Sequence, residues 1–426
     1  MDVTPTKYIA PKYAARFRCI GAECEDACCS GWQVAVDERH YRELERRMGA
    51  TDEERQEFTR KLRPLREAER GHGKYALIVL QDGGRCSFFE KDRLCSLQKR
   101  YGHEALSDTC AMYPRHIGLV GTRVELTAKV SCPEVARQLL LNDDALAMVE
   151  IPGTMVERTG VNRSLATEPR EIYDRALDPV RAAIMSLLGD RRYPFASRLA
   201  FVACLADELG PVFHRGSAAA HTIAMVQAIE RSGSDATRNE IHREFTALQI
   251  PPEFAAEVVL RVLRSCALVG EDSFGRLVRH VLGNGPRATS APVALDEDEV
   301  RRLLVLYENS KKHCEKEFGS RLDRYFSLYS MNYFLQDWYT ASPSLAAHTQ
   351  NLVWRVAVLR FLLLCHPAVA RDSFELDART LDRTAVEVFY KFARGVEHNS
   401  DFLAAVEKDF RSRASDIAQA MFLSKL

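Results

Sequence analysis

The sequence predicts a mainly α-helical protein, in which a small mixed α/β N-terminal domain rich in cysteine precedes a larger all-helical domain. Two observations predict this class. Eight of the twelve cysteines lie in the first 132 residues, among short apolar segments separated by turn residues. Beyond residue 170, apolar residues recur at three-and-four spacing in one segment after another, which is typical of amphipathic helices. At 426 residues the chain is long enough for two or three domains.

The elements expected in the N-terminal part begin after a loop-rich segment, residues 1–36. DERHYRELERRM and TDEERQEFTRKLRPLREAER open with Asp37 and Thr51, which suit the N-cap of a helix. KYALIVL is expected to form a short strand that ends at QDGG. HIGLV and RVELTAKV flank Gly121-Thr122 and predict a hairpin. SCPEVARQLLL then restarts a helix with Pro133 in its first turn.

The remainder of the chain is expected to consist of helices, from EIYDRALDPVRAAIMSLLGD to DFLAAVEKDFRSRASDIAQAMF. The best candidate for a linker is GNGPRATSAPVALD at 283–296, which is rich in Gly, Pro and small residues. We therefore expect a cysteine-rich domain at 1–150, a helical domain at 151–285 and a C-terminal helical domain at 286–426. The last two can form a single unit.

Composition gives no electrostatic argument for a nucleic acid or an anionic membrane as partner, because Lys+Arg and Asp+Glu both number 59. The N-terminus MDVTPTKYIAPKYAARF lacks the apolar core of a secretory signal. The longest apolar runs, such as FLLLC at 361–365, are too short to span a bilayer. We expect a cytoplasmic protein whose thiols stay reduced.

The N-terminal cysteines are candidate metal ligands, because soft thiolates at this density usually hold zinc or an iron–sulfur cluster. They are Cys19, Cys24, Cys28, Cys29, Cys86, Cys95, Cys110 and Cys132. Disulfides are the alternative, which a reducing compartment disfavours. Eight thiolates suit two four-ligand sites, or one site plus structural thiols, and four thiolates do not separate zinc from [4Fe–4S]. His103 could replace one thiolate, although we favour all-thiolate ligation.

Two further expectations concern individual cysteines. The adjacent Cys28 and Cys29 point in different directions on most backbones, so we expect them to have unequal roles. The four downstream cysteines are expected to pack as small apolar residues. They are Cys204, Cys266, Cys314 and Cys365.

The segments CIGAECEDACCSGWQVAVD, CSFFEKDRLCSLQ, LSDTCAMYPR and SCPE resemble the flagellin lysine N-methylase family. That family overlaps a broader group of zinc- or iron-chelating cysteine-cluster proteins. NYFLQDWY and YKFARGVEH in the helical part also fit its pattern. The resemblance implies methyl transfer from S-adenosylmethionine to lysine side chains of flagellin, with an iron–sulfur cluster held by the N-terminal cysteines. The sequence has no CxxxCxxC run and no Gly-rich nucleotide-binding loop of the usual type, which leaves the donor site unlocated.

The implied chemistry needs a neutral lysine amine, whose unperturbed pKa is about 10.4, and an acceptor for its proton. Near the cysteines we expect Asp26, Tyr113 and His116 to be catalytic. Aromatic faces stabilise sulfonium and ammonium cations, so Trp32 is expected to bind the donor. Arg115 can pair with the donor carboxylate or with a neighbouring acid. The alternative roles are structural: a turn cap for Asp26, core aromatics for Trp32 and Tyr113, and a half-buried histidine for His116.

Two other function classes share the cysteines. One is an interaction protein in which structural zinc stabilises the N-terminal domain. The other is a cluster-bearing redox or metallochaperone protein that needs no lysine pocket. Metal analysis and a methylation assay separate these from the methyltransferase.

Overall fold

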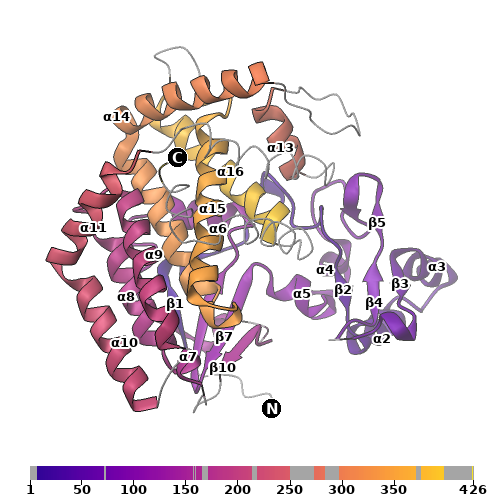
Figure 1. The fold of residues 1–426 in the computed structure, drawn as a ribbon. Coiled ribbons are helices and arrows are strands. Elements are labelled where there is room, and N and C mark those ends of the chain that lie inside the picture. Colours follow the sequence, from indigo (N-terminus) through magenta and orange to yellow (C-terminus); the bar gives the residue numbers. More distant parts are fainter. Residues whose placement is uncertain are drawn as a thin grey trace.

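Helices predominate in the computed structural model, which confirms the mainly α class (Figure 1). The structure describes residues 7–71, 73–156, 158, 160–165, 171–213, 218–249, 273–283, 297–370, 376–397 and 425. Cys266, the last predicted helix and all but the first residue of the predicted linker lie outside these ranges.

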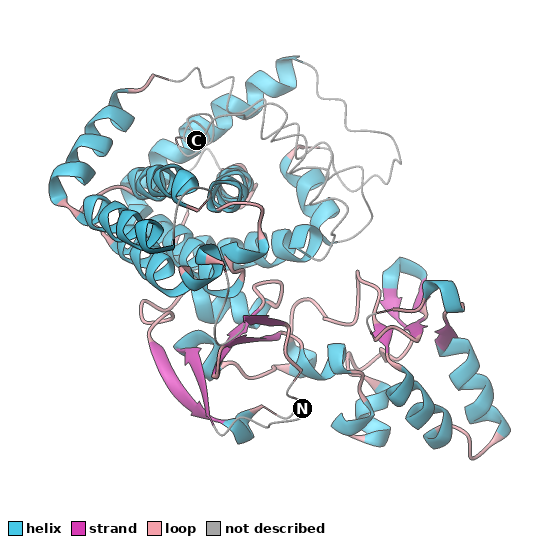
Figure 2. Ribbon diagram, turned by 60° about the horizontal axis from the view of Figure 1, so that its bottom comes forward, coloured by secondary structure: helices cyan, strands magenta, loops and turns pink. Residues whose placement is uncertain are grey.

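A five-stranded sheet lies beneath the helices, in the order β10-β7-β8-β1-β9 (Figure 2). Its strands are β1 (Lys7–Pro11), β7 (Arg115–Val120), β8 (Arg123–Ala128), β9 (Met148–Pro152) and β10 (Arg163–Leu165). The antiparallel pair β7 and β8 is the predicted hairpin, with Gly121 at φ 58° in its turn. β1 pairs in parallel with β8 and antiparallel with β9. The expectation of a purely loop-rich N-terminal segment was therefore wrong at β1, because its pairing partners lie more than a hundred residues away.

The helical body packs on this sheet in one continuous apolar core, which also includes residues of the N-terminal third such as Tyr13 and Leu139. The longest of its helices, α14, has a kink at Phe318. The helices are α1 (Lys12–Arg16), α6 (Pro133–Leu140), α7 (Ile172–Arg175), α8 (Leu177–Gly189), α9 (Phe195–Val212), α10 (Ala218–Gly233), α11 (Asp235–Ala247), α13 (Ser273–Val281), α14 (Glu297–Gln336), α15 (Leu345–Leu364) and α16 (Ala378–Glu397). α6 begins with Pro133 at its first turn, as predicted.

A smaller lobe, called here the cysteine lobe, projects from the body at the right of Figure 1. It has its own apolar core, which includes Val36, Leu44 and Phe88. Its elements are α2 (Glu38–Arg47), α3 (Asp52–Lys61), α4 (Ser96–Tyr101), α5 (Asp108–Met112), β2 (Ala35–Val36), β3 (Leu62–Pro64), β4 (Ala76–Ile78), β5 (Leu80–Gln81) and β6 (Arg85–Cys86). Both predicted N-caps are confirmed, since the side chains of Asp37 and Thr51 accept hydrogen bonds from the backbone of α2 and α3.

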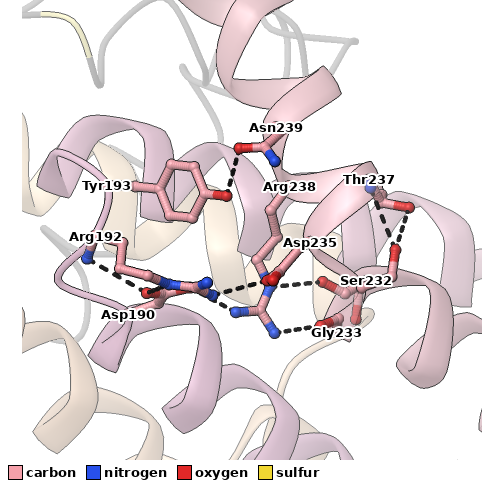
Figure 3. Close-up of polar contacts among 10 residues, drawn as sticks. Asp190, Arg192, Tyr193, Ser232, Gly233, Asp235, Thr237, Arg238 and Asn239 are labelled. Atoms are coloured by element: carbon pink, nitrogen blue, oxygen red, sulfur yellow. Dashed lines mark hydrogen bonds and ion pairs between the residues drawn. The ribbon is translucent and has the colours of Figure 1, made fainter.

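An arginine network joins two helix connections in the body (Figure 3). Arg238 in α11 donates to Asp190, which follows α8, and to the backbone carbonyls of Ser232 and Gly233 at the end of α10. Arg192 donates to both oxygens of Asp190 at 2.8 Å. The network fixes α10 and α11 against the connection from α8 to α9.

The described cysteines are all free thiols. Cys314 and Cys365 are buried in the helical core as expected, whereas Cys204 in α9 is only half-buried. No helix within the described residues is both long and apolar enough to cross a membrane.

Candidate functional site

The smaller of two cavities beside the cysteines has a volume of about 90 Å³ and lies within the cysteine lobe. Its wall carries five thiols: Cys28, Cys29, Cys86, Cys95 and Cys110. Different elements supply them. Cys86 ends β6, Cys95 is the N-cap of α4, and Cys110 lies in α5. The backbone N–H of Cys86 donates to the carbonyl of Cys29 at 2.8 Å, which holds the cysteine loop against β6.

The remaining wall of this cavity is largely apolar, with Val34, Ile78 and Phe88 among its residues. Burial raises the pKa of Cys86 to about 11 and that of Cys110 to about 12. These thiols are therefore protonated without a metal, and metal binding would release their protons.

Cys24, Cys28 and Cys132 form a second group towards the helical body. Cys132 is the N-cap position of α6, although its side chain makes no capping hydrogen bond, and the nearby backbone N–H groups of Val135 and Glu134 act to lower its pKa. Burial nevertheless raises the pKa of Cys132 to about 12. The neighbouring Cys24 and Cys28 raise the pKa of Cys132 further, because a thiolate there would be repelled by theirs. Cys19 lies farther out, on the wall of the larger cavity together with Cys28.

Cys28 and Cys29 occupy different environments. Cys28 lines both cavities, whereas Cys29 lines only the smaller one. The thiol of Cys29 hydrogen-bonds the sulfur of Cys28, which lowers the pKa of Cys28 to about 7 and raises that of Cys29. Cys28 therefore connects the two groups of thiols.

The spacing of the sulfurs bears on which metal they suit. All eight N-terminal cysteines are among the described residues, and no three of their sulfurs lie within 4.8 Å of one another. Tetrahedral zinc with bonds of about 2.3 Å would hold its sulfurs about 3.8 Å apart. This spacing is wider than a single tetrahedral zinc ion would require.

Asp26 and Arg394 join the second group of thiols to the C-terminal helix α16. Arg394 donates to Asp26 Oδ1 at 2.9 Å and to the carbonyls of Ala27 and Ser131 at 3.1 and 3.2 Å. The Arg394 side chain is only 7% exposed. The other carboxylate oxygen of Asp26 is buried and has no hydrogen-bond partner among the residues that the structure describes. A helix from the far end of the chain thus contacts the loop that carries the second group of thiols, and the two groups together are called here the thiol centre.

Tyr113 stands between the two cavities and lines both of them. Its ring lies 5.3 Å from that of Trp32, between centroids, and its hydroxyl hydrogen-bonds Ser131 at 3.1 Å. Trp32 lines the smaller cavity and donates from Nε1 to the carbonyl of Cys28 at 2.6 Å. The structure therefore places both aromatic candidates against the thiols.

The larger cavity, of about 260 Å³, has a cationic wall. It includes Arg18, Arg115 and Arg158 together with His103, and apolar residues such as Phe17 and Met112. The guanidinium of Arg115 lies over the Phe17 ring, 5.3 Å from its centroid. Arg115 is thus adjacent to Cys28 and Tyr113 on the same wall.

His116 has a different environment. Its ring interacts with the charges of Lys129, Asp337 and Arg163, beneath the helical body. Burial lowers the pKa of His116 to about 3, so the imidazole is neutral. The structure does not place it on the wall of either cavity, in contrast to Tyr113 and Arg115.

Asp37, His40 and Asp108 also bring three potential ligand atoms within 4.8 Å of one another. These three residues are instead held together by hydrogen bonds and by an ion pair with Arg158. Asp37 hydrogen-bonds Nδ1 of His40, and Arg158 approaches Nε2 of the same ring at 2.7 Å while pairing with Asp108 at 2.6 Å. The guanidinium already stands where a cation would bind.

Arg394 is the residue at this centre that sequence reasoning missed. It lies more than 360 residues after the first cysteines, within YKFARGVEH, and nothing local distinguishes it from a solvent-facing arginine on an amphipathic helix. The segment fits the pattern of the family, but its sequence does not indicate that any of its residues contacts the thiols.

A family model for the FliB lysine N-methylase C-terminal domain matches residues 181–423, which include α16. The lysine-N-methylase of Salmonella typhimurium is 30% identical over 159 residues, and that of Salmonella choleraesuis is 29% identical over the same length. Each alignment covers 37% of this chain and 37% of the relative, so the chain matches well under half the length of these proteins. The flagellar biosynthetic protein FliU of Salmonella muenchen is 30% identical over 155 residues, which are 35% of this chain and 84% of that protein. No solved structure matches the chain.

Proposed function

We propose that this chain, which belongs to the FliB lysine N-methylase family, transfers methyl groups from S-adenosylmethionine to lysine side chains of flagellin. Family membership confirms the resemblance inferred from the cysteine motifs. The names of the relatives support lysine methylation as the reaction and a flagellar protein as the substrate. The single structural observation that carries the proposal is the buried oxygen of Asp26 beside the thiols, which has no hydrogen-bond partner in the described part of the chain.

We further propose that the N-terminal thiols hold an iron–sulfur cluster. The residues of the smaller cavity would be its main ligands, with Cys28 at the junction to the second group. Such a cluster would supply a fixed frame for the loop that carries Asp26. The wide spacing of the sulfurs and the apolar wall favour this group over zinc.

The larger cavity is suited to a lysine side chain. Its apolar residues, among them Phe17, Met112 and Val156, can pack against the four methylene groups. Its arginines place like charges near an incoming ammonium, and a like charge lowers the pKa of a lysine. Both features favour the neutral amine that the reaction needs.

In the transfer step, the lone pair of the lysine nitrogen attacks the sulfonium methyl carbon in line with the carbon–sulfur bond. A nitrogen–carbon bond forms, the carbon–sulfur bond breaks, and its electron pair stays on sulfur as S-adenosylhomocysteine leaves. Asp26 Oδ2 is our candidate for accepting the lysine proton, because among the described residues it is an unused acceptor close to Cys28, which lines the larger cavity. Asp26 itself is not among the residues of that wall. The rings of Trp32 and Tyr113 can stabilise the cationic methyl group before transfer. Catalytic roles for Tyr113 and His116 and donor binding by Arg115 stay predictions.

The test is methylation of purified flagellin by the anaerobically prepared full chain with S-adenosylmethionine. We expect methyl-lysine on intact-mass and peptide analysis, and a rate loss of about 100-fold or more in Asp26→Asn. Glu25→Gln is the matched control, because the neighbouring carboxylate of Glu25 pairs with Arg137. Absence of methyl-lysine with wild-type protein that contains iron and sulfide would refute the proposed function.

A further inference from the structure

A cluster of charged side chains lies where the sheet meets the C-terminal ends of α14 and α16. Asp337, directly after α14, accepts from Arg163 of β10 at 2.9 Å and from Lys129 after β8 at 3.3 Å. Arg355 of α15 and Glu397 at the end of α16 face each other at 3.6 Å. The charges of Lys129, Arg355 and Asp337 all act on Glu397, so the two pairs form one cluster.

Several polar atoms of this cluster are buried without a hydrogen-bond partner in the described part of the chain. They are Arg163 Nη1, Arg355 Nε, Arg355 Nη1, His348 Nε2 and Glu397 Oε2. The side chains of Arg355 and Glu397 are 5% and 9% exposed. Buried polar groups in proteins are almost always hydrogen-bonded, so a concentration of unused donors and acceptors at one place points to a ligand.

The chemistry of the unused atoms indicates what that ligand carries. Two N–H groups of Arg355 and one of Arg163 are donors that match a carboxylate. Glu397 Oε2 is an acceptor that matches an ammonium group. An α-amino acid carries both charged groups on one carbon atom, and the methyl donor of the proposed reaction ends in such a group.

We propose that this cluster binds the amino-carboxylate end of the methyl donor, with Arg355 and Arg163 holding the carboxylate and Glu397 the ammonium. The inference rests on the proposed function and places its donor. Glu397 lies three positions after Arg394 in α16, about 4.5 Å along the helix axis. One turn of α16 therefore connects the arginine that holds Asp26 to the donor cluster.

The competing location for the donor is the larger cavity beside Cys28, with Arg115 as the carboxylate partner. Its wall carries three arginines and no carboxylate side chain. The Tyr113 ring can face the sulfonium there, but the ammonium of the donor has no carboxylate partner on that wall. The donor cluster supplies the unused Oε2 of Glu397 as a partner for that ammonium.

The experiment compares two ligands by calorimetric titration of the full chain. S-adenosylhomocysteine has the amino-carboxylate group, and 5′-methylthioadenosine shares its adenosine and thioether but lacks that group. We expect wild-type protein to bind S-adenosylhomocysteine more tightly than 5′-methylthioadenosine. Arg355→Lys and Arg163→Gln should each lower the affinity for S-adenosylhomocysteine by about 10- to 100-fold. The affinity for 5′-methylthioadenosine should not change.

Arg360→Lys is the matched control, because Arg360 lies on the same helix and pairs with Glu315 instead. It should bind both ligands as the wild type does. Arg163 is 29% exposed, so its variant keeps the test valid if Arg355→Lys does not fold. A loss of S-adenosylhomocysteine affinity in Arg115→Gln, with none in the two donor-cluster variants, would overturn the inference.

The two proposals fail in different ways. Methylation of flagellin together with unchanged affinities in Arg355→Lys and Arg163→Gln would refute only the placement of the donor. Wild-type protein that contains iron and sulfide but binds neither ligand and methylates nothing would refute the proposed function, and this inference with it.

Discussion

At Asp26, the two carboxylate oxygens have different environments. One pairs with Arg394, and the other is buried and has no partner within the described ranges. A carboxylate that is held on one side and unused on the other has a fixed orientation and a spare acceptor, which suits proton acceptance. Asp26 was predicted from its position in the cysteine loop, whereas the arginine that holds it was not.

The Asp26–Arg394 pair should contribute measurably to stability, because Arg394 is 7% and Asp26 17% exposed. Arg394→Met leaves a mostly buried carboxylate without its partner, and we expect the free energy of unfolding to fall by about 2–4 kcal/mol. The double variant Asp26→Asn with Arg394→Met should recover about 1 kcal/mol or more of that loss. Urea unfolding of the four proteins measures this cycle, and strictly additive effects would show that the pair is not coupled.

Cys28 and Cys29 should respond differently to replacement by serine. Cys29 faces only the smaller cavity, so we expect Cys29→Ser to lose most of the bound iron and the visible colour. Cys28 lies at the junction of the two groups, so Cys28→Ser should keep more iron but lose methylation. Iron, sulfide and activity measured on anaerobic samples test this, with Cys365→Ser in the helical core as the control. Equal losses in both variants would contradict the unequal roles.

At the scale of elements, the arginine network of Figure 3 fixes α10 and α11 to the rest of the body. Arg238 and Asp190 are 11% and 9% exposed, so removing one partner leaves a buried charge. We expect Arg238→Met to lower the free energy of unfolding by about 2–4 kcal/mol. Arg192→Met is the comparison, because Arg192 is 57% exposed and its loss should change stability little. A larger effect for Arg192 than for Arg238 would contradict this assignment.

The same network predicts a pH dependence. Hydrogen bonds from Arg192 and then Arg238 hold the pKa of Asp190 well below its ordinary value. A carboxyl group whose pKa is lower in the folded state stabilises the fold above its unfolded pKa of about 3.9. That stabilisation is lost as the pH falls further towards the folded pKa. Asp190→Asn should therefore flatten the fall in stability between about pH 5 and about pH 3, measured by urea unfolding at each pH.

The elements that the sequence predicted correctly are those with local signals. The hairpin of β7 and β8 has a glycine turn between two alternating segments, and α2, α3 and α6 each begin with a capping residue or a proline. β1 escaped prediction because five residues carry too little periodicity and its partners, β8 and β9, are distant in sequence. Pairing between distant segments leaves no local pattern.

The same reasoning applies to the site at the scale of the whole molecule. Cysteine spacing was sufficient to predict that the N-terminal thiols gather at one place, and the structure places Trp32, Tyr113 and Arg115 beside them. It was not sufficient to predict Arg394 or the donor cluster, because these depend on how α14, α15 and α16 pack on the sheet. His116 was assigned to the thiols from sequence proximity, but successive residues of a strand point to opposite faces, so Arg115 and His116 separate.

The cysteine lobe and the helical body have separate apolar cores, and this separation predicts how the protein would respond to loss of the proposed cluster. Thiols form much of the wall between the lobe elements β6, α4 and α5, and a small core gains much of its stability from a bound metal. Removal of the metal with a chelator under anaerobic conditions should therefore speed amide hydrogen exchange in β2, β4, α4 and α5. Exchange in α9 and α15 should stay unchanged, because their core contacts involve no N-terminal thiol other than Cys132.

Hydrogen exchange read by mass spectrometry locates the effect, and a sample reloaded with iron and sulfide is the control. An increase spread evenly through the helical body, or none in the lobe, would show that the thiol centre does not stabilise the lobe.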